Sequence, residues 1–138
     1  MRRTLPLILL ALVVSLATPL AQSNAAAENN AIGVWTGTYT GDGSGKYTMT
    51  IQRDAAKKLG GSVSSTNETG ESNTSTFKTV VVNGPKLSIT YATSDGDGGE
   101  VQLEATLDKS SLTGAWKVID SAKNVVQSGT FTGTKGGK

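Results

Sequence analysis

Two short stretches, Gly33–Tyr39 (GVWTGTY) and Gly129–Lys135 (GTFTGTK), decide the fold that the sequence predicts. Each places a glycine two residues before an aromatic residue and continues with Thr-Gly-Thr. Alternation of nonpolar residues with threonine is typical of a strand with one buried and one solvent-facing side. Because the stretches open and close the β-rich region, we expect them to pair as its first and last strands. The residues expected to close the sheet, with both aromatic rings inward, are Gly33, Trp35, Gly129 and Phe131.

The same period of two recurs between these stretches, for example in Val101–Leu107. Turns rich in glycine, aspartate and asparagine, such as Gly41–Gly45, separate the segments. The predicted strands are residues 32–40, 45–53, 59–66, 73–82, 86–93, 100–107, 112–119 and 125–134. We therefore predict an all-β fold, an eight-stranded antiparallel up-and-down meander that closes into a small barrel. A β-sandwich gives the same strand spacing and is the alternative.

The first residues have the pattern of a secretory signal peptide. A basic start with Arg2 and Arg3 precedes an apolar run from Leu5 to Leu16, which is too short for a typical membrane span. Small residues place the cleavage site within 25–27. We therefore divide the chain into a signal peptide (1–27), a short linker (28–31), one β-barrel domain (32–134) and a flexible basic tail (135–138). The predicted location is secreted or periplasmic, in a bacterium.

Charge and composition exclude several classes of function. Without Arg2 and Arg3, 11 basic residues balance 11 acidic ones, so the mature chain lacks the positive field of a nucleic-acid-binding protein. The mature chain also has no apolar run long enough to span a membrane. The sequence does not identify a protein partner.

No catalytic residue, metal site or cofactor is predicted. The chain has no histidine and no cysteine, which removes imidazole-based nucleophilic catalysis, thiolate chemistry and zinc sites built on imidazole. Glu100 and Glu104 fall on the solvent side of a predicted strand. The acidic run Asp95–Glu100 lacks the spacing of a calcium-binding EF-hand and is interpreted as a turn.

Gly33-Val34-Trp35 resembles the Gly-x-Trp that opens the barrel in calycin-type proteins, the lipocalins and avidin-like proteins. The resemblance implies a barrel in which this tryptophan closes one end. The chain lacks the C-terminal helix and the disulfide common in lipocalins. It has only two tryptophans, Trp35 and Trp116, so no biotin site is transferred to it.

Four aromatic residues are the candidates for ligand contact: Trp116, Tyr39, Tyr47 and Tyr91. The inward glycines Gly37, Gly61 and Gly114 are expected to leave room beside them. We predict an exported, non-enzymatic barrel that binds a small apolar or mixed ligand in its interior. The alternatives are a structural or interaction domain of the cell envelope with a filled core and, third, a hydrolase based on carboxylates.

Overall fold

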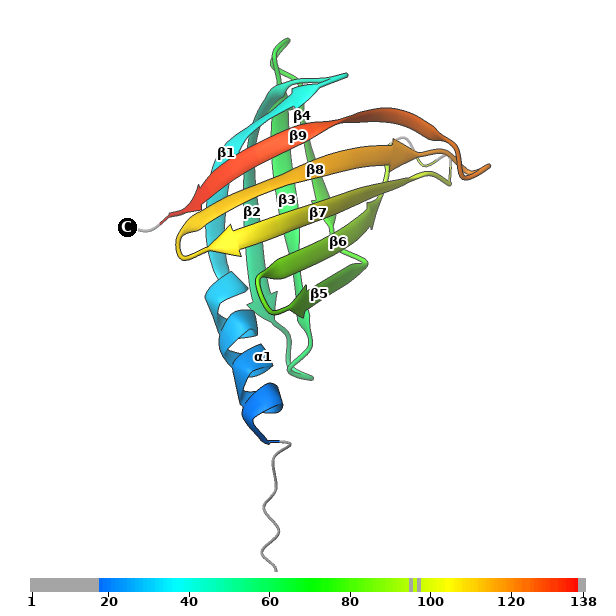
Figure 1. Ribbon diagram of the computed structural model, residues 1–138. Helices are drawn as coiled ribbons and strands as arrows, with labels where there is room; N and C mark the ends of the chain where they lie inside the picture. Colours follow the sequence, from blue (N-terminus) through cyan, green and yellow to red (C-terminus); the bar gives the residue numbers. More distant parts are fainter. Residues whose placement is uncertain (1–17, 95, 97, 137–138) are drawn as a thin grey trace, which may run out of the picture.

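The computed structural model describes residues 18–94, 96 and 98–136 of the chain. Within these residues, a single helix precedes nine strands, which form one curled antiparallel sheet (Figure 1). The elements are α1 (Thr18–Ala31), β1 (Gly33–Gly41), β2 (Gly45–Arg53), β3 (Leu59–Asn67), β4 (Ser72–Thr76), β5 (Thr79–Asn83), β6 (Lys86–Ala92), β7 (Glu100–Asp108), β8 (Ser111–Ile119) and β9 (Val125–Lys135). The predicted all-β class is confirmed, whereas the β-sandwich alternative is wrong because all strands belong to one sheet.

The order of strands in the sheet is β4-β3-β2-β1-β9-β8-β7-β6-β5. The predicted pairing of the first strand with the last is present, since β1 and β9 are antiparallel neighbours. Because the strands run in opposite directions, only the central glycines of the two motifs, Gly37 and Gly133, meet, and the two aromatic positions do not. Trp35 lies opposite Lys135, and Phe131 lies opposite Tyr39. Both Trp35 and Phe131 are buried on the concave side of the sheet.

The prediction of eight strands is wrong in one place. Residues 73–82, expected as one strand, form two strands, β4 and β5, that pair with different neighbours. The break lies at Phe77 and Lys78: the Phe77 amide donates to the Gly61 carbonyl next to β4, whereas the Lys78 amide donates to the Thr90 carbonyl of β6. A continuous alternation of polar and apolar residues hides this break, because a strand that changes partners keeps its period of two.

Two ends of the sheet can be distinguished. The helix end carries α1 and the turns at 53–59, 83–86 and 108–111. The cavity end carries the turns at 41–45, 67–72 and 119–125, together with the end of β6 at Ala92 and the start of β7 at Glu100. Asp95 and Asp97, which belong to the acidic run considered for calcium, lie outside the described residues. Among the described residues, no helix is long and apolar enough to cross a membrane.

Helix α1 lies at the helix end of the sheet and packs on the core through Ala27 and Ala31 of its C-terminal half (Figure 1). Residues 28–31, expected as a linker, form its last turn, and Ala31 is completely buried. Residues 1–17 of the predicted signal peptide lie outside the described residues, and 18–27 belong to α1. Lys135, assigned to a flexible tail, is instead the last residue of β9, and its amide donates to the Ser110 carbonyl.

The core lies inside the curl of the sheet and follows the predicted alternation. The large side chains that are almost completely buried are Trp35, Met49, Ile51, Leu87, Ile89 and Leu112. Most of these lie toward the helix end, whereas the cavity end carries most of the inward-facing polar side chains. The described core therefore packs more tightly at one end than at the other.

Candidate functional site

A cavity of about 430 Å³ lies inside the sheet at its cavity end. The four aromatic residues predicted from the sequence, Tyr39, Tyr47, Tyr91 and Trp116, all line it, although they come from four different strands. Gly43 in the β1–β2 turn lines it as well, so the cavity reaches the surface between the turns. A volume of this size is typical of a small-molecule site.

Tyr47 is held in place by contacts across the seam between β1 and β9. Its ring extends from β2 across β1 toward Gly133, where a Cβ atom would lie only 2.4 Å from its hydroxyl oxygen. The hydroxyl donates a 2.9 Å hydrogen bond to the Thr132 carbonyl of β9. The ring meets Phe131 edge to face, with 5.9 Å between centroids. Tyr47 thus presents its ring rather than its hydroxyl to the cavity.

Trp116 makes the corresponding contact from the other side of the seam. It extends from β8 across β9 at Gly129, where a Cβ atom would lie 2.7 Å from the indole nitrogen. The indole N–H donates to the Thr40 carbonyl of β1 at 3.1 Å. The ring meets Tyr39 edge to face at 6.0 Å between centroids. An aromatic ring that covers a glycine of the neighbouring strand stabilises the sheet where it bends.

The glycines expected to make room for a ligand have another role. A Cβ atom on Gly37 would lie 1.8 Å from the Thr132 carbonyl oxygen, and one on Gly61 would lie 1.8 Å from that of Thr50. Gly114 is similarly close to the backbone of β7. None of the three lines the cavity. They are glycines because neighbouring backbone approaches too closely for a side chain, as happens where strands of a curled sheet bend.

Tyr91 and Tyr39 are the two tyrosines whose hydroxyls make no hydrogen bond to any described residue. The Tyr91 ring packs against Phe77 at 5.9 Å between centroids. Burial, with a smaller contribution from Tyr39, raises the pKa of Tyr91 to about 12. Burial also raises the pKa of Tyr47 to about 12. Tyr47 and Tyr91 therefore stay protonated at neutral pH.

The cavity also has polar lining residues that the sequence analysis missed. Ser65 lies on β3, Asn73 and Ser75 lie on β4, and Gln127 lies on β9. The period of two could have identified Ser65, since it lies on the same face as buried Val63. Small polar residues at inward positions give no signal of their own, because only apolar residues distinguish the buried face of a strand.

The helix end, in contrast, is filled. Trp35 is completely buried, and its indole N–H donates a 2.9 Å hydrogen bond to the Ala31 carbonyl of α1. The Lys135 ammonium lies 5.3 Å from the centre of the Trp35 ring, a distance typical of a cation–π contact. Of the predicted closing residues, Gly33 is also at this end, opposite Ile51, whereas Gly129 and Phe131 lie toward the cavity.

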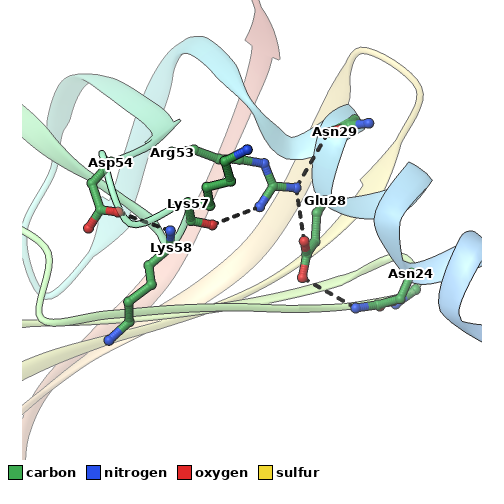
Figure 2. Close-up of polar contacts among 8 residues, drawn as sticks. Asn24, Glu28, Asn29, Arg53, Asp54, Lys57 and Lys58 are labelled. Carbon is green, nitrogen blue, oxygen red and sulfur yellow. Dashed lines mark hydrogen bonds and ion pairs between the residues drawn. The ribbon is translucent and has the colours of Figure 1, made fainter.

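Polar contacts attach α1 to the β2–β3 hairpin. Figure 2 shows the Arg53 guanidinium between the Glu28 carboxylate, 3.0 Å away, and the Lys57 carbonyl, 3.2 Å away. The amide of Asn24 donates to the same Glu28 carboxylate at 3.4 Å. A shallow hollow here is lined by Arg53 and several lysines, but Arg53 is already bound to the protein. This cluster holds the helix in place.

The acidic residues considered for catalysis lie outside the cavity. Glu104 is exposed and accepts a hydrogen bond from the Ser88 hydroxyl at 2.8 Å. Hydrogen bonds from Gln102 and then Lys78 lower the pKa of Glu100. Within the described residues, no group of three or more acidic, histidine or cysteine side chains could hold a metal ion.

No family model matches the chain, and no curated protein matches it in sequence. Among solved structures, the chain is similar to the β-barrel protein EF1p2_mFAP2b bound to DFHBI, with a TM-score of 0.66 and 16% sequence identity. The match covers 83% of this chain and 98% of the other. At this identity the similarity shows the fold alone.

Proposed function

We propose that this chain is an exported, non-enzymatic β-barrel protein that binds a small molecule in the cavity described above. The observation that carries the proposal is the contrast between the ends of the sheet. Trp35 and α1 fill one end, whereas Tyr39, Tyr47, Tyr91 and Trp116 surround a cavity of about 430 Å³ at the other. The similar β-barrel EF1p2_mFAP2b binds the small organic molecule DFHBI, which supports the same use of the fold here.

Closure of the sheet into a barrel belongs to this proposal. The connection between β4 and β5 is hydrogen-bonded to both flanking strands, through Phe77 to Gly61 and through Lys78 to Thr90. Each bond continues the pairing of one edge strand with its own neighbour, β4 with β3 and β5 with β6. Only Phe77 and Lys78 separate these two edge strands in the chain, which supports closure at this point. A barrel of this calycin-like kind holds one small ligand in its interior.

Two observations support a role in binding rather than catalysis. The chain has no histidine or cysteine, and the described residues that line the cavity include no carboxylate, lysine or arginine. General acid–base catalysis works best with a group whose pKa lies near the operating pH. Tyr47 and Tyr91 do not meet that condition, because their pKa values are raised to about 12.

Export is proposed from the signal-peptide pattern of the first 27 residues. The side chains of Ala25 and Ala26 are exposed on α1. The Glu28–Arg53 ion pair and the Ala31–Trp35 hydrogen bond follow the expected cleavage region, so a chain cut there keeps both. N-terminal sequencing of the exported protein should find a start between residues 26 and 28. A mature chain that still begins with Met1 would contradict export.

Binding in the cavity is tested by filling it. Ser75 lines the cavity from β4, whereas the adjacent Thr74 is exposed on the outer face of the same strand. Titration with Nile red, an uncharged dye whose fluorescence rises in apolar surroundings, should give saturable binding to the wild type and to Thr74→Phe. Ser75→Phe should abolish it. Equal binding by both variants would place the dye elsewhere, and absence of saturable binding to the wild type would overturn the proposed function for this class of ligand.

A further inference from the structure

The distribution of polar atoms around the cavity indicates what kind of molecule it accepts, given the small-molecule binding proposed above. We propose that the ligand is an uncharged amphiphile: an apolar body lies against β7 and β8, and hydrogen-bonding groups along one edge face β3 and β4. This inference rests on the proposed function and makes it more specific. Three features of the cavity wall carry it.

The first feature is the lack of charged side chains among the described residues of the cavity wall. None of the described residues that line the cavity is Asp, Glu, Lys or Arg. A charged group that leaves water without an opposite charge or several hydrogen bonds loses far more hydration free energy than a neutral polar group loses. The interior therefore discriminates against carboxylates, phosphates and ammonium groups, whatever their apolar portion.

The second feature is an apolar wall on β7 and β8. Val101 and Leu103 of β7 and Trp116 and Val118 of β8 all line the cavity. The indole N–H of Trp116 is already bonded to the Thr40 carbonyl, so this residue offers a ligand only its ring. This wall can bury an apolar body, but it gives no directional polar contact.

The third feature is a polar wall on β3 and β4, where inner and outer side chains differ. On the outer face, the hydroxyls of Ser64 and Thr74 bond each other at 2.7 Å across the strands. On the inner face, Ser65 lies opposite Asn73. Ser75 lies two residues after Asn73 on the same face of β4, opposite Val63. None of these three inner side chains makes a hydrogen bond to a described residue. Their donors and acceptors face the cavity and are available to a ligand.

Tyr91 extends this set of hydrogen-bonding residues. It lines the same cavity from β6, and its hydroxyl has no hydrogen-bond partner among the described residues. Asn67, by contrast, is committed to its own turn: its side-chain oxygen accepts from the amides of Thr69 and Glu71, each at 3.0 Å. Among the described residues, four free polar groups thus gather on the β3–β4 side and at Tyr91, whereas β7 and β8 offer none. Ser44, Gln127 and the Tyr39 hydroxyl lie elsewhere on the wall, so the side opposite β7 and β8 gives the ligand its orientation.

Three related fluorescent probes test the inference: methoxycoumarin, which is uncharged and carries a lactone edge, its carboxylate derivative, and methoxynaphthalene, which lacks the lactone. Methoxycoumarin should bind most tightly. The carboxylate should bind at least about tenfold more weakly because its charge must be desolvated. Replacing Asn73 and Ser75 together by alanine should weaken methoxycoumarin roughly five- to tenfold through lost hydrogen bonds, and should leave methoxynaphthalene unchanged.

The matched control is the double variant Ser64→Ala/Thr74→Ala, which removes the outer hydroxyl pair of the same two strands. It should leave all three affinities unchanged. Equal binding of methoxycoumarin and its carboxylate, or equal loss of both uncharged probes in the inner double variant, would overturn this inference while leaving small-molecule binding in place. Failure of all three probes and of Nile red to bind would instead count against the proposed function itself.

Discussion

Trp35 and Trp116 show how differently one sheet is used at its two ends. Both rings face inward, and both indole N–H groups donate to a backbone carbonyl, that of Ala31 or that of Thr40. Trp35 is completely buried beneath α1, whereas Trp116 stays partly exposed among the turns of the cavity end. The two residues thus have the same orientation on their strands and the same kind of hydrogen bond. They differ in whether another segment of the chain packs over their end of the sheet.

The largest expected effect comes from truncating the covered tryptophan. Trp35→Ala should lower the free energy of unfolding by about 3–5 kcal/mol, because it leaves a cavity in a closed core. Trp116→Ala should cost clearly less, about 1–2 kcal/mol, because its ring is already partly in contact with water. Denaturant unfolding of both variants measures the difference. Equal losses would show that the two ends are packed alike, contrary to the comparison above.

A second prediction concerns the seam between β1 and β9, which runs from the helix end of the sheet to the cavity end. Gly37→Ala should destabilise the protein by about 3 kcal/mol, since its Cβ atom would lie 1.8 Å from the Thr132 carbonyl oxygen and must push β1 away from β9. Gly60→Ala is the control, because a Cβ atom there meets nothing within 4 Å. Thermal unfolding should separate the two variants. Similar melting temperatures would mean that the close approach at Gly37 is relieved without disturbing the seam.

The third prediction is an alkaline loss of stability that begins at the cavity end. The folded pKa values of Tyr47 and Tyr91 are about 12, above the usual value of 10.0. Below pH 10 both the folded and the unfolded chain keep these protons, so stability is unaffected. Between pH 10 and about 12 the unfolded chain releases them first, and the free energy of unfolding falls. Urea unfolding at a series of pH values measures the decline.

Two substitutions divide that decline between the tyrosines. Tyr91→Phe should leave stability at neutral pH nearly unchanged and reduce the loss between pH 10 and 12, since the Tyr91 hydroxyl has no partner among the described residues. Tyr47→Phe should cost about 1 kcal/mol at neutral pH because its bond to the Thr132 carbonyl is lost. If Tyr91→Phe loses as much unfolding free energy between pH 10 and 12 as the wild type, Tyr91 does not contribute to the alkaline loss of stability.

The smallest expected effect concerns a turn that the two ends share. At 54–58 and at 120–124 an aspartate accepts hydrogen bonds from the amides two and four residues later, and a lysine has positive φ. The turn at 67–71 has Gly70 in that position. Lys57→Gly and Lys123→Gly should each stabilise the protein by about 0.5–1 kcal/mol. Gly70→Lys should destabilise it by a similar amount, and chemical unfolding decides whether the three agree.

Much of the fold could be predicted because strand periodicity is local. The boundaries of β2 match the predicted residues 45–53, and most other strands match to within one residue. Helix α1 was missed because its sequence, rich in alanine and asparagine, falls in the region assigned to a signal peptide and a linker. The split between β4 and β5 was missed because a change of partner at Phe77 leaves no trace in the alternation of residues.

Some residues of the candidate site could likewise be predicted from the sequence, and others could not. Tyr39, Tyr47, Tyr91 and Trp116 could be chosen from the sequence, since aromatic residues on the inner face of strands are few. Ser65 could have been found from its spacing to buried Val63, but Asn73 and Ser75 could not, because β4 (SNTST) has no apolar residue to mark its inner face. Only the pairing of strands shows that outer hydroxyls are bonded to each other and inner ones are not.

By itself, the sequence determined the strands of an all-β fold and the turns between them, because hydrophobic alternation and turn residues act over a few neighbouring positions. The pairing of the first strand with the last was predicted from the repeated motif at the two ends. The tertiary structure decided which glycine meets which backbone, where the fourth predicted strand changes partners, and which end of the sheet is covered. These features depend on residues far apart in the chain, such as Tyr47 and Thr132 or Ala31 and Trp35 with Lys135. Trp35 is buried in the core because α1 packs at its end of the sheet, whereas Trp116 lines the cavity at the end without a helix. No local sequence pattern encodes where α1 packs.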